Sequence, residues 1–181
     1  MLRPFIASLL EQAVTSPEDP LLAGEGISVP EGDRCESIFG LFAAGVALGD
    51  IAHILGCSVL TVQDDIEQAR GRRPALASQE ERVSWELHRA VVDRLRDDAA
   101  PVLAAARDHL EVLRRGDQGG SDARLAEWEQ LLDGDTESLI DSMLAPGEPG
   151  AQLRRLTPFA DALTADERLA ALRKAAVPAP L

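Results

Sequence analysis

Residues 48–67 have the sequence LGDIAHILGCSVLTVQDDIE, and this stretch decides the predicted fold. Its spacing is that of two helices joined by a tight turn, because the small residue Ala52 is followed four positions later by Gly56. Ser58 is placed to cap the second helix by accepting from backbone N–H groups. Apolar residues fill the buried positions of such a pair, namely Ile51, Leu55, Val62 and Ile66. We therefore expect a helix-turn-helix, closed into a trihelical core by a preceding helix with Phe39, Leu41 and Phe42.

Composition indicates an all-α protein of a reducing compartment. Apolar residues make up 45% of the 181-residue chain but aromatic residues only 3%, so the core must consist of Leu, Ala, Val and Ile. No apolar run is long enough to cross a membrane. The apolar segment at residues 2–10 is short, contains one Arg and lacks a cleavage site, so a signal peptide is not expected. Two cysteines, Cys35 and Cys57, give no disulfide framework. We therefore expect a cytoplasmic protein without membrane association.

Four regions are expected along the chain: residues 1–33, 34–74, 78–115 and 121–177. The first contains a short helix at 2–14 and a Pro-, Gly- and acid-rich loop from residue 16 to 33. The second is the trihelical unit, with helices at about 34–45, 49–56 and 58–70. The third is a long connecting helix that opens with a capping box, Ser78 with Glu81, and that Pro101 kinks or breaks into two.

The fourth region is a small helical module behind the linker GDQGGS at residues 116–121. Its first helices are expected at 122–132 and 137–144. The Pro- and Gly-rich segment at 146–150 should break the helical pattern. A second capping box, Thr164 with Glu167, should start a final helix that ends near Ala176.

Three stretches of the sequence resemble known bacterial proteins. The run IAHILGCSVLTV (residues 51–62) is similar to the helix-turn-helix of sigma-factor region four and of related response-regulator output domains. Residues 37–69 also resemble small antitoxin-like domains with the same trihelical core. The tail, with Trp128 and LRRLTPFADALTADER (residues 153–168), looks like the C-terminal extension of some short regulators and antitoxins. These resemblances cover about half of the chain and imply DNA binding, a protein partner, or both.

The charge of the second helix differs from the pattern of sigma-type units, which carry Lys or Arg on the face that enters the major groove. Here that face presents Val59, Leu60, Gln63, Asp64 and Glu67, and the chain has a formal net charge of −13. Carboxylates repel phosphates, and an acidic side chain suits DNA only where it accepts from a cytosine amine. A trihelical domain that is kept for protein contacts is the alternative.

A basic cluster, Arg70, Arg72 and Arg73, follows the second helix directly. These side chains have two interpretations: contacts with phosphate or a minor groove, or favourable cations at a helix C-terminus. The candidate DNA-binding residues are Ser58, Leu60, Thr61, Gln63, Asp64, Arg70, Arg72 and Arg73.

An apolar stripe follows the predicted helix at 78–115 among many charged residues. It either forms one side of an intramolecular bundle or pairs two copies of the chain, since regulators with one helix-turn-helix often dimerise to reach two half-sites. We expect a homodimer, and the candidate partner-binding residues are Trp85, Val92, Leu95, Trp128 and Phe159.

No catalytic, cofactor or metal site is expected. The sequence lacks a nucleophile elbow and a phosphate-binding glycine loop, and Gly24–Gly26 has no flanking strand and helix. Cys35, His53 and Cys57 lack a fourth ligand for zinc, and His88 and His109 are expected to be solvated. The chain is therefore predicted not to be an enzyme.

The leading functional hypothesis is a helix-turn-helix transcriptional regulator or antitoxin-like DNA-binding protein. It would act with a protein partner such as a toxin or a component of the transcription machinery. The alternative is an adaptor or toxin-neutralising module whose helix-turn-helix does not read DNA.

Overall fold

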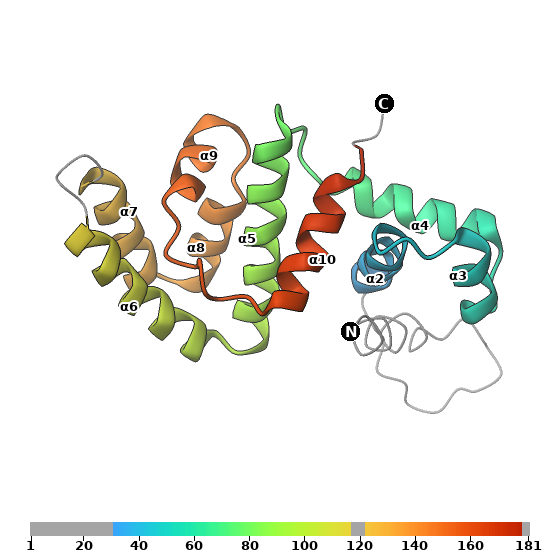
Figure 1. Cartoon of the computed structure of the whole chain (residues 1–181), viewed down its shortest axis with the longest axis horizontal. Coiled ribbons are helices and arrows are strands. Elements are labelled where there is room, and N and C mark those ends of the chain that lie inside the picture. The colour runs from blue at the N-terminus through green and yellow to red at the C-terminus, as the bar shows by residue number, and fades with distance from the viewer. Residues whose placement is uncertain (1–30, 117–121, 179–181) are drawn as a thin grey trace. The chain divides into compact units, whose positions relative to one another are not determined.

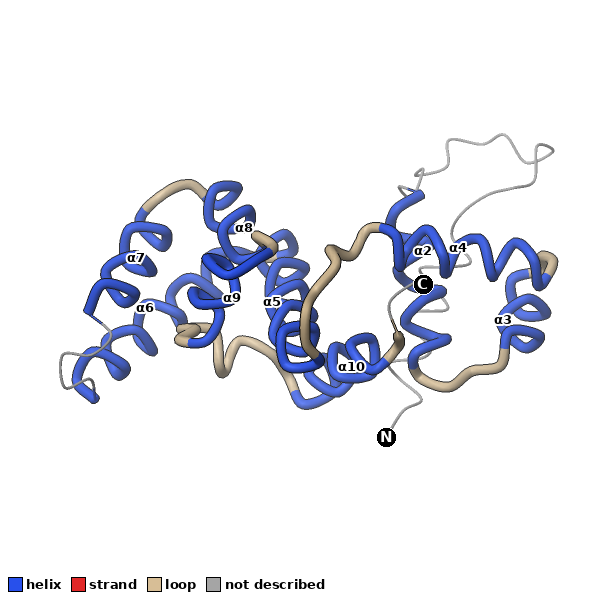
Figure 2. The backbone as a smooth tube through the Cα atoms, turned by 90° about the horizontal axis from the view of Figure 1, so that it is seen from above, coloured by secondary structure: helices blue, strands red, loops and turns tan. Residues whose placement is uncertain are grey.

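The computed structural model describes residues 31–116 and 122–178, and all regular secondary structure in these ranges is α-helical (Figures 1 and 2). The expected all-α fold is therefore confirmed for this part of the chain. The expected helix at 2–14, the Gly24–Gly26 segment and residues 117–121 of the linker lie outside the described residues. The helices are α2 (Glu31–Ala43), α3 (Leu48–Leu55), α4 (Val59–Gly71), α5 (Gln79–Asp97), α6 (Ala99–Gly116), α7 (Asp122–Asp133), α8 (Thr136–Leu144), α9 (Gly147–Arg155) and α10 (Ala165–Ala176).

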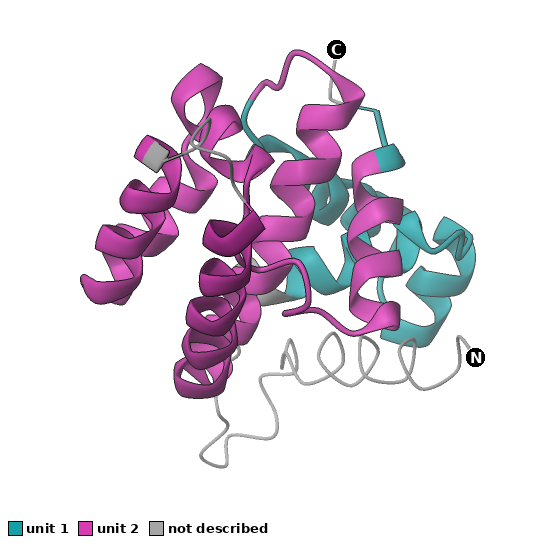
Figure 3. Ribbon diagram, turned by 60° about the vertical axis from the view of Figure 1, so that its left-hand side comes forward, with its two compact units in different colours: residues 1–74, 176–181 teal, residues 75–175 magenta. Residues whose placement is uncertain are grey.

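The chain divides into two compact units (Figure 3). Unit 1 consists of residues 1–74 and 176–181, and unit 2 consists of residues 75–175. The helices expected at 78–115 and those expected beyond residue 121 thus contribute to the same unit. None of the helices in the described ranges combines the length and the apolar character that crossing a bilayer requires.

In the described part of unit 1, the helices α2, α3 and α4 each pack against the other two. Helix α2 begins at Glu31, three residues earlier than expected, and ends at Ala43. Its last turn closes on Gly45, whose φ of 89° is left-handed, with Val46 N–H donating to Leu41 O at 3.1 Å. The buried apolar core consists of Cys35, Ile38, Phe39, Leu41, Ile51, Ala52, Val62, Ile66 and Ala69.

The helix expected at 78–115 is two helices, α5 and α6, which are separated at Asp98. Of the two outcomes predicted for Pro101, a break is therefore the correct one. Pro101 lies in the first turn of α6, where a backbone N–H would have no partner inside the helix. The chain changes direction at Asp98, so Pro101 does not have to fit inside one continuous helix.

Helix α9 corrects the expectation that residues 146–150 interrupt helical structure. The break is confined to Ala145 and Pro146, and α9 already begins at Gly147. Pro149 falls in the first turn of α9, a position that does not need an N–H donor. Helices α7, α8 and α10 lie within one or two residues of their expected positions.

Both predicted cap residues, Ser78 and Thr164, cap their helices, but only the pair of Thr164 and Glu167 closes as a reciprocal capping box. Glu81 N–H donates to Ser78 Oγ at 3.1 Å, and the Glu81 carboxylate accepts from Ala77 N–H at 3.0 Å. Thr164 and Glu167 bond reciprocally, because Glu167 N–H donates to Thr164 Oγ1 at 3.3 Å and Thr164 N–H donates to the Glu167 carboxylate at 2.7 Å. These contacts fix the beginnings of α5 and α10, because the first N–H groups of a helix have no partners of their own.

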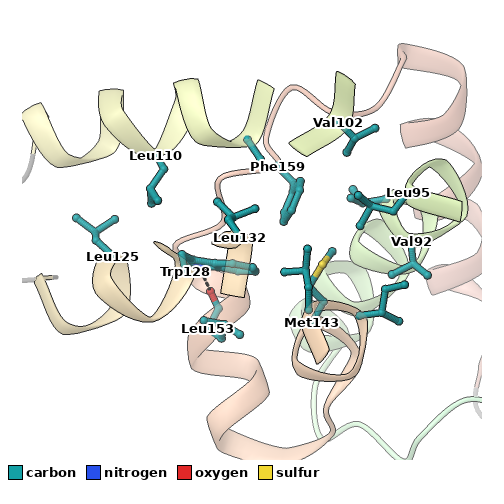
Figure 4. Close-up of a cluster of buried hydrophobic side chains, with 14 residues drawn as sticks. Val92, Leu95, Val102, Leu110, Leu125, Trp128, Leu132, Met143, Leu153 and Phe159 are labelled. Carbon is teal, nitrogen blue, oxygen red and sulfur yellow. Dashed lines mark hydrogen bonds between the residues drawn. The ribbon is translucent and has the colours of Figure 1, made fainter. Parts of the chain in front are cut away.

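Unit 2 has one apolar core to which α5, α6, α7, α8 and α9 all contribute (Figure 4). Helix α5 packs against α6, α8 and α9, whereas α7 packs against α6 and α8. Helix α10 is tied to α5 by an ion pair between Arg94 and Glu167 at 3.1 Å and by a bond from Gln79 Nε2 to Ala175 O at 3.1 Å. The apolar stripe of the predicted connecting helix is therefore covered within the chain.

Candidate functional site

The turn between α3 and α4 has the geometry that residues 48–67 predict. Gly56 adopts a left-handed φ of 65°, and its N–H donates to His53 O at 3.4 Å, while Cys57 N–H donates to Ala52 O at 3.1 Å. This pair of bonds ends α3 in a Schellman motif, which favours glycine at the left-handed position. Ser58 then caps α4 by accepting from Thr61 N–H at 3.1 Å. The two helices are thus joined by three residues.

The buried side of the pair is also as expected. Ala52 is 5% exposed where α3 meets the core, and Ile51, Val62 and Ile66 are buried beside it. Leu55 is partly buried against the same cluster. Apolar spacing in the sequence therefore identified the inward faces of α3 and α4 correctly.

The outward side of α3 and α4 is both apolar and acidic. Ile54 is 46% exposed, Val59 is 42% exposed and Leu60 is 71% exposed, and all three flank the turn. We call this the α3–α4 surface, and it comprises Asp50, Ile54, Val59, Leu60, Gln63, Asp64 and Glu67, all of which are exposed. Residues 48–69 contain four carboxylates and no Lys or Arg. The surface therefore has no cation of its own to place on a phosphate.

Arg73, the last member of the basic cluster, is held inside unit 1. Its guanidinium makes a bidentate pair with Glu36 at 2.9 and 3.1 Å, and it lies 4.1 Å from the centre of the Phe39 ring. Its Nη1 also donates to Ala69 O, at the end of α4. The side chain is only 13% exposed. It therefore joins α4 to α2, as a cation that complements the C-terminus of a helix does.

Arg70 is likewise engaged, since it pairs with Glu67 at 2.6 Å and donates to Pro178 O at 2.6 Å. Arg34, another base of the unit, lies 3.4 Å from the buried carboxylate of Asp65. Arg72 is exposed at the end of α4 and has an interaction of its own. The structure thus places the predicted basic cluster beside α4 and directs Arg70 and Arg73 to partners within the unit.

The residues that were expected to bind a partner are buried, so the expectation of a partner-binding surface there is wrong. Trp85, Val92, Leu95, Trp128 and Phe159 are each 5% exposed or less. Trp128 Nε1 donates to Leu153 O at 3.2 Å, and its ring meets Phe159 edge-on with 5.6 Å between centroids (Figure 4). These residues form the core of unit 2 because neighbouring helices of the same chain cover them. Of the two interpretations of the stripe, the intramolecular bundle holds.

A buried polar cluster in unit 2 was missed by sequence reasoning, which expected His88 to be solvated. His88 is 4% exposed; its Nδ1 lies 2.7 Å from Ser84 O and its Nε2 lies 2.9 Å from Thr157 Oγ1. A carbonyl only accepts, so Nδ1 carries the proton and Nε2 accepts from the Thr157 hydroxyl. Burial, together with the charge of Arg154, lowers the pKa of His88 from 6.5 to about 4. His109 is partly buried and lies 3.6 Å from Asp161.

Arg154 is the second member of this cluster, and its side chain has no exposure to solvent. Its Nη1 donates to Met143 O at 3.0 Å and to Ala145 O at 2.8 Å, at the C-terminus of α8. Trp85 Nε1 donates to the carbonyl between them, Leu144 O, at 3.1 Å. The last carbonyls of α8 are therefore satisfied by side chains of α9 and α5, and the cluster has a structural role. Burial lowers the pKa of the guanidinium, and the charge of Glu81 opposes that shift.

No arrangement for metal binding or catalysis stands out in the described ranges. Within them, no three His, Cys, Asp or Glu side chains are grouped as metal ligands would be. Cys35 is buried and donates to Asp65 Oδ1 and Gln68 Oε1, both at 3.4 Å, whereas His53 is exposed. The α3–α4 surface is consequently the feature that calls for a functional explanation.

Comparison with known proteins does not assign the chain to a family. The chain matches no family model, and neither a curated protein nor a solved structure is significantly similar to it.

Proposed function

We propose that this chain is a cytoplasmic protein-interaction adaptor that binds a protein partner through the α3–α4 surface and does not read DNA. The observation that carries the proposal is the lack of Lys and Arg between residues 48 and 69, where four carboxylates lie. A DNA reader obtains much of its affinity by neutralising phosphates, and carboxylates at the groove would repel them.

The environment of the basic cluster supports the same proposal. Arg73 and Arg70, two of the three arginines at the end of α4, are engaged by Glu36 and by Glu67 and Pro178 O. Moving them to DNA would break these contacts and leave the Glu36 carboxylate, which is 16% exposed, without its guanidinium. The structural role of these arginines therefore competes with a role in binding.

Exposed apolar side chains support a protein partner. Leu60, which is 71% exposed, is the most exposed large apolar residue of the described part of the chain, and Val59 and Ile54 adjoin the same turn. Grouped apolar exposure beside polar residues is typical of a protein-binding surface, where a few such side chains supply most of the affinity.

A DNA-binding regulator is the second candidate, and one observation favours it. The Schellman turn at Gly56 and the Ser58 cap join α3 to α4 by three residues, which is typical of a helix-turn-helix, and Gln63 and Asp64 on α4 are exposed. A toxin or a component of the transcription machinery fits either candidate as the protein partner.

A DNA titration separates the two candidates. Fluorescence anisotropy of random and genomic DNA at about 50 mM salt should show no binding by the parent chain at tens of micromolar protein. Asp64→Lys should gain weak affinity for every sequence alike, since a non-reading helix loses repulsion. Sequence-selective binding by the parent, weakened by Gln63→Ala, would refute the proposal.

Site-specific crosslinking tests the protein contact directly. A photoreactive amino acid in place of Leu60 should give a protein adduct in the native host cell. The same substitution at Val112, which is 59% exposed on α6, is the matched control and should give none. Identical adducts from both positions, or an adduct with DNA alone, would contradict the proposed docking at the α3–α4 surface.

A further inference from the structure

The α3–α4 surface also carries information about the chemistry of its partner. Its apolar part is small: Leu60 and Val59 lie in the first turn of α4, and Ile54 lies in the last turn of α3. Apolar side chains within one helical turn on either side of a three-residue connection form a small surface, which one helical face with residues i, i+3 and i+4 can cover. A single amphipathic helix is therefore a sufficient occupant.

The acidic part follows the apolar part along α4. Asp64 is four residues beyond Leu60 and Glu67 is seven residues beyond it, which is about 6 and 10 Å along the helix axis. One oxygen of Glu67 accepts from Arg70 at 2.6 Å, and its side chain is 57% exposed. Asp50 adds a third carboxylate on the exposed side of α3. An occupant that buries Leu60 consequently has its flanking residues within reach of carboxylates, which favours cations at those positions.

We propose that the occupant of the α3–α4 surface is a basic amphipathic helix of a partner protein, with Lys or Arg one and two turns from its apolar anchors. This inference rests on the proposed function. Other occupants would be repelled by the negative charge of the surface. A second copy of the chain docked through the same surface would place carboxylate against carboxylate. Nucleic acids and anionic membranes would be repelled for the same reason.

Three model peptides of about 18 residues test the charge of the occupant. Each has Leu at i, i+3, i+4 and i+7 and differs in the flanking positions, which are all Lys, all Gln or all Glu. Anisotropy against the full chain at low salt should show the Lys peptide binding about tenfold more tightly than the Gln peptide, with the Glu peptide weakest. The preference for Lys should shrink as salt is raised.

Variants then place the binding on the surface. Leu60→Ser should weaken the Lys peptide about tenfold or more, whereas Val112→Ser, on α6, should leave it unchanged. The double variant Asp64→Asn, Glu67→Gln should reduce the preference for Lys over Gln to about onefold to threefold. All these side chains are exposed, so a circular-dichroism spectrum like that of the parent is expected for each variant.

The peptide results can overturn the basic partner without overturning the proposed protein-binding function. Equal binding of the Lys and Gln peptides, lost in Leu60→Ser, would keep the docking surface and overturn the basic partner. A Lys peptide that binds all variants like the parent, or no peptide that binds at all, would also overturn the inference. The crosslinking from Leu60 and the DNA titration judge the proposed function independently of the peptides.

Discussion

Lowering the pH from about 7.5 to about 5 should destabilise unit 2, because His88 is neutral in the folded chain. The ring donates from Nδ1 to Ser84 O and accepts at Nε2 from Thr157, and Arg154 lies close enough to repel a second positive charge. Protonation of Nε2 would replace the acceptor that faces the Thr157 hydroxyl with a donor. Unfolding relieves both problems, since the ring is then hydrated and titrates normally.

The sign and the size of the effect follow from the lowered pKa. The pKa of His88 is about 4 in the folded chain against an ordinary 6.5. Stability from the neutral ring is therefore complete above pH 6.5 and is lost as the pH falls from 6.5 towards 4. At about 1.4 kcal/mol per pH unit, the loss is about 2 kcal/mol by pH 5 and about 3 kcal/mol in full.

Urea unfolding followed by tryptophan fluorescence measures this loss, because both tryptophans, Trp85 and Trp128, belong to unit 2. The carboxyl groups of Glu129 and Glu167, whose pKa values are lowered from 4.5, should act in a lower pH range and leave the window above pH 5 to His88. His88→Gln is the control: its free energy of unfolding should change with pH by about 2 kcal/mol less than that of the parent. Equal pH dependence of parent and variant would refute a buried neutral His88.

Three further substitutions test the packing. Ala52→Asp should destabilise unit 1 by about 3 kcal/mol, because it buries an unpaired charge where α3 meets the core; a melting curve like that of the parent, followed by circular dichroism, would place Ala52 elsewhere. Gly150→Ala should lower the stability of unit 2 by about 1 to 3 kcal/mol in urea, since a Cβ there would overlap the Ala145 carbonyl. Arg73→Ala should cost unit 1 about 1 to 3 kcal/mol in thermal unfolding, because it removes the bidentate pair with Glu36. An unchanged midpoint would mean that Arg73 is available for a role in binding.

The local devices of this fold could be predicted from the sequence because each depends on neighbouring residues. Gly56 and Ser58 set the turn between α3 and α4, and the two predicted cap residues set the beginnings of α5 and α10. Their signals are specific residue types at fixed short spacings, and the hydrogen bonds that they make close within six residues. The outward positions of Leu60 and Asp64 followed from the same helical period.

Tertiary structure decided what covers each apolar stripe and where each charge goes. The stripe of α5 indicated a buried face, yet its sequence is equally compatible with a second copy of the chain or with α6, α8 and α9. His88 lies on that stripe, three residues after Trp85, so its position in the sequence indicated burial. Its hydrogen-bond partner Thr157 is 69 residues away and could not be inferred from the sequence. Nothing in the sequence around Arg154 indicates that this residue is buried, because its burial depends on the end of α8 lying against α9. Helical periodicity fixes which side of a helix is apolar, but long-range packing selects the neighbour, because the hydrophobic effect has no direction.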